Sequence, residues 1–248
     1  MDSARQAPLA SHVRRLRRAE GRRFIVALIP ARNDSDGNAI GSLRAQDTPP
    51  DLIVVCADGS SEDTVTEAER AGAVVFETDE HGQAGVLNQA LERMLPELWE
   101  DDSILIMDAD SVLAPSFLAE ARDLLGDGIG GVGGVFTRRS RSFVRILRRN
   151  RNASEAALVS VSAIRHVVWA RQKGVLPGGG PQVYDTRVRT TDGQLTLALL
   201  LLGYKVVSPQ GHRRTATWFE SWRDLCRQRL RWKRGTLANP SEGVTKSA

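Results

Sequence analysis

The sequence predicts an α/β fold with a mostly parallel central sheet and helices on both faces. Apolar runs of the length of buried strands recur in the first half of the chain, and helix-like segments separate them. Strands that alternate with helices in this way pair in parallel. The chain has 248 residues, of which 41% are hydrophobic and 26% charged, the balance of one large globular domain.

The first half contains four predicted strands and the helices between them. The first strand is closed by Pro30, and a polar loop with a short helix leads to the second. The next helix has Ser60 or Ser61 as its N-cap and Gly72 after its end. Strands are expected at residues 24–29, 51–56, 73–77 and 103–107, and long helices at 61–71, 85–95 and 115–125.

The alternation of strands and helices is interrupted after Gly126. Residues 128–134 hold five glycines and lead into an Arg-rich stretch. Further along, an apolar helix and a short strand are expected, and then a basic amphipathic helix. The expected elements are a helix-like segment at 152–171, a Gly/Pro loop at 174–181, a helix at 193–202, a strand at 205–208 and a basic helix at 218–235. We therefore expect one domain at 24–235, made of halves at 24–125 and 126–235, with a tail at 236–248.

Basic residues are concentrated in three segments although the net charge is only +4. Residues 1–23 and 138–151 each carry seven arginines, and 205–246 carry ten lysines and arginines against three acids. We expect 1–23 to be a basic, flexible N-terminal arm. Such segments suit an anionic membrane, nucleic acid or a diphosphate. Few aromatic residues interleave with the arginines, so nucleic-acid binding is the weakest of these readings.

Other classes of protein are disfavoured. The longest apolar stretch, near 195–207, is shorter than the roughly 20 residues that span a bilayer. The apolar run at 24–29 is broken by Pro30 and Arg32 and does not resemble a signal peptide. We expect a cytoplasmic protein with peripheral contact to the inner face of the membrane through its Arg-rich segments. Cys56 and Cys226 lack metal-ligand spacing and predict neither a zinc site nor a disulfide framework.

Polar residues follow three of the predicted strands, at Asn33, Asp58 and the pair Asp108 and Asp110. Ligands of parallel sheets bind beyond the carboxyl ends of the strands. In an extended backbone Asp108 and Asp110 point to the same side, where two carboxylates can hold Mg²⁺ or Mn²⁺ together with substrate phosphates. The alternative for each position is ordinary acidic turn chemistry.

Six motifs, in order along residues 24–235, resemble those of the family-2 glycosyltransferases. The similarity is greatest to the branch that contains cellulose, chitin and hyaluronan synthases. The motifs are Ile-Pro-Ala-Arg-Asn at 29–33, Ala-Asp-Gly-Ser at 57–60, His-Gly-Gln-Ala-Gly-Val-Leu-Asn at 81–88, Asp-Ala-Asp at 108–110, Thr-Thr-Asp at 190–192 and Gln-Arg-Leu-Arg-Trp at 228–232. The resemblance implies a nucleotide-diphospho-sugar transferase (GT-A) fold. It also implies inverting, metal-dependent transfer of a hexosyl or N-acetylhexosaminyl group from a nucleotide-sugar, expected to be a UDP-sugar, to a glycan, lipid-linked or protein acceptor.

The resemblance also implies roles for individual residues. Asp192 would be the general base that takes the proton of the acceptor hydroxyl. Asp108 and Asp110 would bind the divalent cation, Mg²⁺ or Mn²⁺, and through it the donor diphosphate. The donor-binding set would be Pro30, Ala31, Asn33, Asp58, Gln83, Asn88, Asp108 and Asp110. The set near the diphosphate and the acceptor would be Gln228, Arg231 and Trp232.

Some motif residues also have a purely structural explanation, and some positions differ from the family motifs, so alternatives remain open. Asp192 suits a helix N-cap, and Trp232 a core aromatic. Gln83 stands where the family usually has Lys, Thr191 replaces the middle Glu of the base motif, and the segment at 175–190 is short. A catalytically impaired relative that binds sugar-nucleotides is therefore the first alternative, and an Arg-rich nucleic-acid-binding protein the second.

Overall fold

The computed structural model describes residues 8–19, 22–31, 37–59, 62–78, 82–133, 135–136, 156–178, 180–188, 191–207 and 213–216. The strands are β1 (Ile25–Ala31), β2 (Leu52–Ala57), β3 (Val74–Glu77), β4 (Ser103–Met107), β5 (Ser111–Leu113), β6 (Ile129–Gly133), β7 (Val135–Phe136), β8 (Ala156–Ser160), β9 (Lys205–Val207) and β10 (Arg213–Ala216). The helices are α2 (Pro8–Ala19), α3 (Gly37–Arg44), α4 (Glu62–Arg70), α5 (Gln83–Met94), α6 (Phe117–Leu124), α7 (Val161–Gln172), α8 (Asp192–Leu201) and the short 3₁₀ helix η1 (Leu95–Glu97).

Seven strands form the central sheet, in the order β3-β2-β1-β4-β8-β6-β9. The first four run parallel to one another. β8 is antiparallel to both of its neighbours, and β9 is parallel to β6. The predicted α/β class with a mostly parallel sheet is confirmed. Three short strands, β5, β10 and β7, form a second small sheet.

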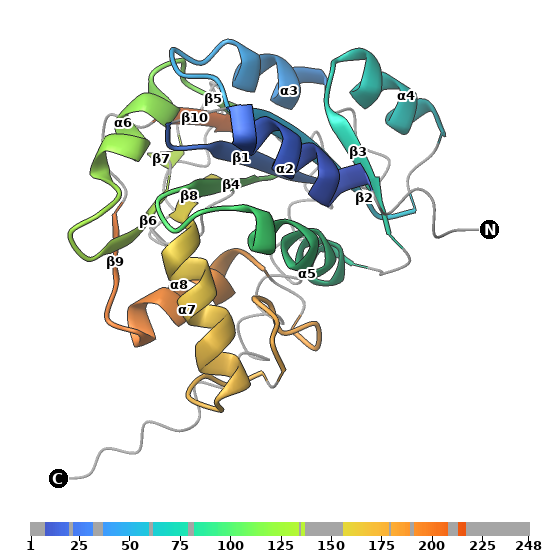
Figure 1. Cartoon of the computed structure of the whole chain (residues 1–248). Coiled ribbons are helices and arrows are strands. Elements are labelled where there is room, and N and C mark those ends of the chain that lie inside the picture. Colours follow the sequence, from blue (N-terminus) through green and yellow to red (C-terminus); the bar gives the residue numbers. More distant parts are fainter. Residues whose placement is uncertain are drawn as a thin grey trace, which may run out of the picture.

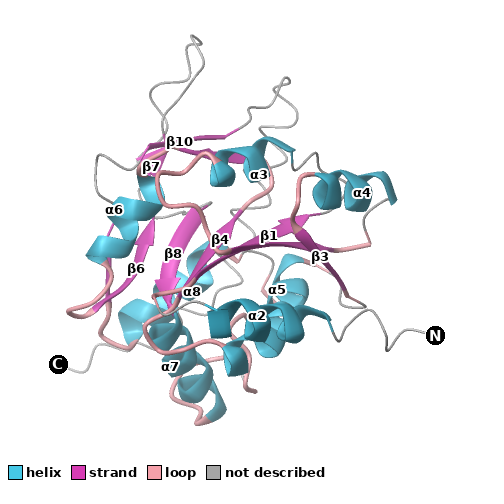
Figure 2. Ribbon diagram, turned by 45° about the horizontal axis from the view of Figure 1, so that its top comes forward, coloured by secondary structure: helices cyan, strands magenta, loops and turns pink. Residues whose placement is uncertain are grey.

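Helices cover both faces of the central sheet, so the molecule has three layers (Figures 1 and 2). Side chains of a strand point alternately to opposite faces. Val26 and Leu28 of β1 pack with α2, α5, α7 and α8, whereas Ile25 and Ala27 pack with α3, α4 and α6. The continuous apolar runs of the sequence are therefore strands that are buried on both faces.

The expectation of a flexible arm at 1–23 is wrong for its described part. Residues 8–19 form α2, whose Leu9 and Val13 are buried in the core. Arg17 is also buried, and its Nε donates to Asp102 at 3.0 Å. Its guanidinium carbon lies 3.4 Å from the centroid of the Trp99 ring. The basic residues of this helix thus include one that joins it to the domain.

The expected helix at 152–171 is also corrected. Its first described residues, Ala156–Ser160, form β8, which pairs with β4 and β6 in the middle of the sheet. The helix begins only at Val161, and the Ser160 hydroxyl caps it by accepting the Ala163 N–H at 3.3 Å. Alanine and leucine suit helices, but here pairing on both sides stabilises the extended backbone.

The glycine-rich segment contains β6, which the sequence analysis did not predict. A Cβ atom on Gly130 would lie 2.9 Å from the Tyr204 ring, so this strand position admits only glycine without a shift. The predicted basic helix at 218–235 lies outside the described residues. Among the helices that the structure does describe, none combines the length and the apolar character that a bilayer crossing needs.

Candidate active site

The predicted strand-end residues Asp58 and Asp108 lie at the same edge of the sheet. β1 lies between β2 and β4 and runs parallel to both, so the three strands end on the same side. Asp58 directly follows β2, and its N–H donates to the carbonyl of Ala31 at the end of β1 at 3.0 Å. Asp108 directly follows β4. The Asp58 and Asp108 positions thus flank the end of β1.

The N-terminus of α5 connects these two acids. The Gly82 N–H donates to Asp58 Oδ2 at 3.0 Å, and the side-chain amide of Gln83 donates to Asp108 Oδ1 at 2.9 Å. Two consecutive residues, Gly82 and Gln83, therefore contact the residues that follow β2 and β4. The helix N-terminus also contributes partial positive charge beside the two carboxylates, which favours anions.

Gly82 adopts a backbone conformation that only glycine tolerates, with φ 81° and ψ 150°. Space does not restrict it, because a Cβ at this position would meet nothing within 4 Å. We expect Gly82→Ala to destabilise the protein by about 1–3 kcal/mol through backbone strain alone. Urea unfolding measures this change.

Gly41→Ala is the matched control, because a Cβ there also meets open space but the residue lies inside helix α3. That substitution should stabilise the protein slightly. If both variants unfold at the same urea concentration, the conformation of Gly82 is not required.

Asp108 and Asp110 lie in a turn and not in an extended segment as the sequence analysis expected. The Ser111 N–H donates to the Asp108 carbonyl at 3.0 Å, which closes the turn between β4 and β5. Asp108 is half-buried and Asp110 is exposed. This turn keeps both residues next to the end of β4.

The residues at this turn fit a hard divalent cation. The described residues contain no cluster of three or more His, Cys, Asp or Glu side chains that could enclose a metal. Two carboxylates with one exposed are nevertheless enough for Mg²⁺, which commonly takes its remaining ligands from water and substrate phosphates. Asp108 and Asp110 are therefore the candidate metal ligands.

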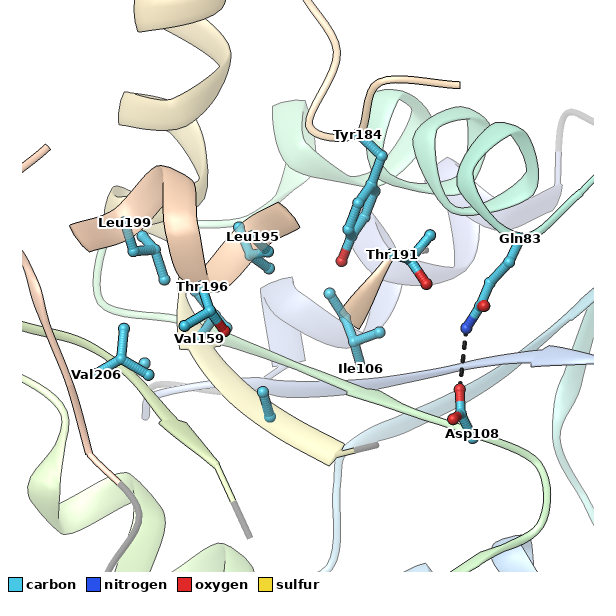
Figure 3. A pocket seen from close by; sticks show the side chains of 12 residues that line it. Gln83, Ile106, Asp108, Val159, Tyr184, Thr191, Leu195, Thr196, Leu199 and Val206 are labelled. Carbon is cyan, nitrogen blue, oxygen red and sulfur yellow. Dashed lines mark hydrogen bonds between the residues drawn. The ribbon is translucent and has the colours of Figure 1, made fainter. Parts of the chain in front are cut away.

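A pocket opens beside Asp108 and runs between the sheet and α8 (Figure 3). Its floor is the face of the sheet that α2, α5, α7 and α8 cover. The lining residues are Gln83, Ile106, Asp108, Gly131, Ala157, Val159, Tyr184, Thr191, Leu195, Thr196, Leu199 and Val206. Both halves of the chain contribute, so the pocket exists only in the complete domain.

Tyr184 forms part of the pocket wall, and two side-chain amides hold its backbone. Asn88 accepts the Tyr184 N–H at 2.9 Å and donates to the Tyr184 carbonyl at 2.8 Å. Gln194 of α8 accepts the N–H of Asp185 at 2.8 Å and donates to the Asp185 carbonyl at 3.3 Å. Hydrogen bonds from Arg187 hold the pKa of the Asp185 carboxyl below its usual value. The residues before α8 are thus fixed from both sides.

Asn88, a predicted donor-binding residue, is buried and forms hydrogen bonds with this wall segment. Asn88→Ala leaves a buried N–H and a buried carbonyl of Tyr184 without these partners, which costs about 1–3 kcal/mol for each group. We expect a clear loss of unfolding free energy in urea. Gln89→Ala is the control, because the Oε1 atom of Gln89 is buried without a partner among the described residues. Equal losses for both variants would mean that Asn88 does not hold the wall.

Asp192 is the first residue of α8, and Thr191 occupies the N-cap position. Thr191 lines the pocket beside Gln83 and Asp108 (Figure 3). The helix therefore starts beside the pocket, and the N-cap position belongs to Thr191 and not to Asp192 as the alternative had it. The side chain of Asp192 lies outside the description.

The structure brings together some of the predicted residues and leaves others aside. Asp58, Gln83, Asp108 and the start of α8 meet at the sheet edge. Pro30 and Ala31 end β1 at the same edge. Predicted residues outside the described ranges are Asn33, Gln228, Arg231 and Trp232. Tyr184, Gln194 and Thr196 were missed, because no sequence motif marks them.

Cys56 is close to the site in sequence but is not a nucleophile candidate. It is fully buried in β2, and burial raises the pKa of its thiol to about 12. The thiol therefore stays protonated and unreactive.

The chain matches a family model in sequence and several solved structures in fold. The model of the family described as "Glycosyl transferase family 2" matches residues 27–176. No curated protein sequence matches the chain. One similar structure is glucosyl-3-phosphoglycerate synthase from Mycobacterium tuberculosis in complex with Mn²⁺, uridine diphosphate (UDP) and glucosyl-3-phosphoglycerate. It is 21% identical, with a TM-score of 0.53 over 90% of this chain and 84% of that one.

The same synthase in complex with Mg²⁺ and UDP is 18% identical, with a TM-score of 0.56 over 90% of this chain and 83% of that one. TarS from S. aureus is 15% identical, with a TM-score of 0.55 over 79% of this chain and 37% of that one. At these sequence identities the similarity shows that the chains share a fold.

Proposed function

The chain belongs to glycosyl transferase family 2, and on that premise we propose that it transfers a sugar from a UDP-sugar to an acceptor hydroxyl with inversion. The observation that carries the proposal is the pair of contacts from Gly82 and Gln83 to Asp58 and Asp108. These contacts assemble two strand-end carboxylates and a helix N-terminus beside one pocket. Nucleotide ligands bind at such edges of parallel sheets.

We assign the nucleotide to the ends of β1 and β2. Asp58 lies there, and its carboxylate accepts the Gly82 N–H. Pro30 and Ala31 are the last residues of β1, and Asn33 follows them in the sequence. Gln83 then lies between the nucleotide and Asp108. Asn88 contributes indirectly in this account, because it holds Tyr184.

Asp108 and Asp110 would hold the divalent cation, which supplies positive charge for the departing diphosphate. Complexes of the synthase from Mycobacterium tuberculosis with Mn²⁺ or Mg²⁺ and UDP support a cation and this nucleotide for a protein of the same fold. In our proposal Gln228, Arg231 and Trp232 lie near the diphosphate and the acceptor. Arg231 would add positive charge there.

Asp192 would act as the general base. Inverting transfer needs a carboxylate that removes the proton of the acceptor hydroxyl as its oxygen attacks the anomeric carbon. The assignment is supported by the start of α8 at Asp192, next to Thr191, which lines the pocket together with Asp108. The acceptor is proposed only as a hydroxyl of a glycan, lipid-linked or protein acceptor, and the Arg-rich segments are proposed to contact an anionic membrane.

The test is hydrolysis of a panel of nucleotide-sugars with Mn²⁺ or Mg²⁺, because slow nucleotide release requires no known acceptor. We expect release from one or more UDP-sugars that stops with a chelator and with Asp110→Ala. Absence of release and of any nucleotide-sugar binding by the folded protein would overturn the proposal.

A specific observation favours one second function, a sugar-nucleotide-binding protein without turnover. Gln83 stands where the family usually has Lys, and its amide already contacts Asp108. Thermal-shift measurements on the same panel separate the two functions, because a binding protein is stabilised by the donor and releases no nucleotide.

A further inference from the structure

The pocket beside Asp108 changes in character along its length. Gln83, Asp108 and Thr191 lie together at one end, while Leu199 and Val206 lie at the other (Figure 3). Between the two ends lie apolar side chains such as Ile106, Val159 and Leu195, with Thr196 among them. A ligand that fits this pocket has a polar or charged part beside Asp108 and a small apolar part beneath α8.

Small residues on two neighbouring strands line the pocket, and the one on β6 lies near the apolar end. Gly131 of β6 and Ala157 of β8 both line the pocket. A Cβ atom on Gly131 would lie 3.4 Å from Leu199 Cδ1, 3.7 Å from Val159 Cγ2 and 3.8 Å from Val206 Cγ1. These are ordinary van der Waals distances, so one added methyl group enters this end of the pocket without a clash.

We propose that this pocket receives the acyl substituent of an N-acetylated hexosamine donor, so that the enzyme is an N-acetylhexosaminyltransferase. The inference rests on the proposed function, because it requires the donor diphosphate beside Asp108. The acetamido methyl then lies toward Leu199 and Gly131, and the sugar ring lies at the polar end.

The chemistry of the lining favours an acetamido group over a plain hydroxyl. In a hexose donor a ring hydroxyl replaces the whole acetamido group and does not reach the space among Val159, Leu195 and Leu199. An acetamido methyl in the same place is removed from water with a favourable free energy. The hydroxyls of Tyr184 and Thr196 line the pocket as polar groups within reach of an amide. The apolar lining therefore favours the donor that carries an acetamido methyl.

The experiment measures the affinities of UDP, UDP-glucose and UDP-N-acetylglucosamine in Mn²⁺ for the full chain by calorimetry. Wild type should bind UDP-N-acetylglucosamine about tenfold or more tightly than UDP-glucose, the range that small differences in pocket contacts produce. Gly131→Ala should reduce this preference several-fold and leave the affinity for UDP alone unchanged. Gly41→Ala, which adds the same methyl in open space on α3, should change neither.

The outcomes distinguish the two levels of the argument. If UDP binds but wild type prefers UDP-glucose, or if Gly131→Ala does not alter the preference, the acyl pocket is overturned and the proposed function stands. If the folded protein binds none of the three, the proposed donor site itself fails. A UDP affinity that falls in Gly131→Ala would also contradict the assignment, because the methyl would then act on the nucleotide and not on the sugar.

Discussion

Asp192→Asn is expected to slow nucleotide release from the donor about 10²–10⁴-fold, the usual contribution of a general base. The substitution keeps the size of the side chain and removes its ability to accept a proton. Asp192 begins α8 directly after Thr191, which lines the pocket together with Asp108. Because the base acts on the attacking hydroxyl or water, the affinity for UDP should stay unchanged. Initial rates at saturating donor, together with calorimetry of UDP, measure the two quantities.

Asp123→Asn provides the matched control for this prediction. Asp123 is exposed on α6, on the opposite face of the sheet, where it forms an ion pair with its neighbour Arg122. Its rate should equal that of wild type. A wild-type rate in Asp192→Asn would remove Asp192 from the mechanism, and a loss of UDP affinity would make it a binding residue instead.

Arg17→Ala is expected to destabilise the protein by about 3–5 kcal/mol, because it leaves the Asp102 carboxylate buried without its charged partner. Arg17 is 3% exposed and Asp102 is fully buried. Among the described residues, the Asp102 carboxylate also accepts the N–H groups of Phe24 and Trp99, at 2.8 and 2.7 Å. For a domain of this size the melting temperature should fall by roughly 6–20 °C.

Arg14→Ala is the control on the same helix. Arg14 pairs with Glu97 at the surface, where ion pairs contribute little. Its melting temperature should stay close to that of wild type. Equal melting temperatures for the Arg14 and Arg17 variants would show that α2 is not held by the buried pair and would support the flexible arm that the sequence suggested.

The sequence predicted the parallel half of the sheet because each of its strands has a recognisable local pattern. The runs that became β1, β2 and β4 are apolar at nearly every position, as strands buried on both faces must be. β8 was mistaken for helix because Ala156–Ser160 has helix-forming residues, and only its partners β4 and β6 make it a strand. α2 was mistaken for an arm because its arginines hid the spacing of Leu9 and Val13.

The residues of the candidate site also fall into those that a local motif predicts and those that it does not. Asp58, Gln83 and Asp108 were identified because each belongs to a short motif at a strand end or helix start. In the structure Gln83 contacts Asp108, and its neighbour Gly82 contacts Asp58. Tyr184 could not be identified, because its place in the pocket depends on Asn88 and Gln194, which lie on two different helices. Pockets built from long-range contacts leave no local pattern in a sequence.

The central claim is that Asp58, Gly82, Gln83 and Asp108 form a metal-dependent nucleotide site. Calorimetric titration of UDP into wild type and into Asp108→Ala, each with Mn²⁺ and with a chelator, tests it most directly. We expect UDP to bind wild type only when Mn²⁺ is present, and Asp108→Ala to remain folded and bind at least tenfold more weakly. UDP binding that is indifferent to both Mn²⁺ and Asp108, or no binding to folded wild type, would contradict the account.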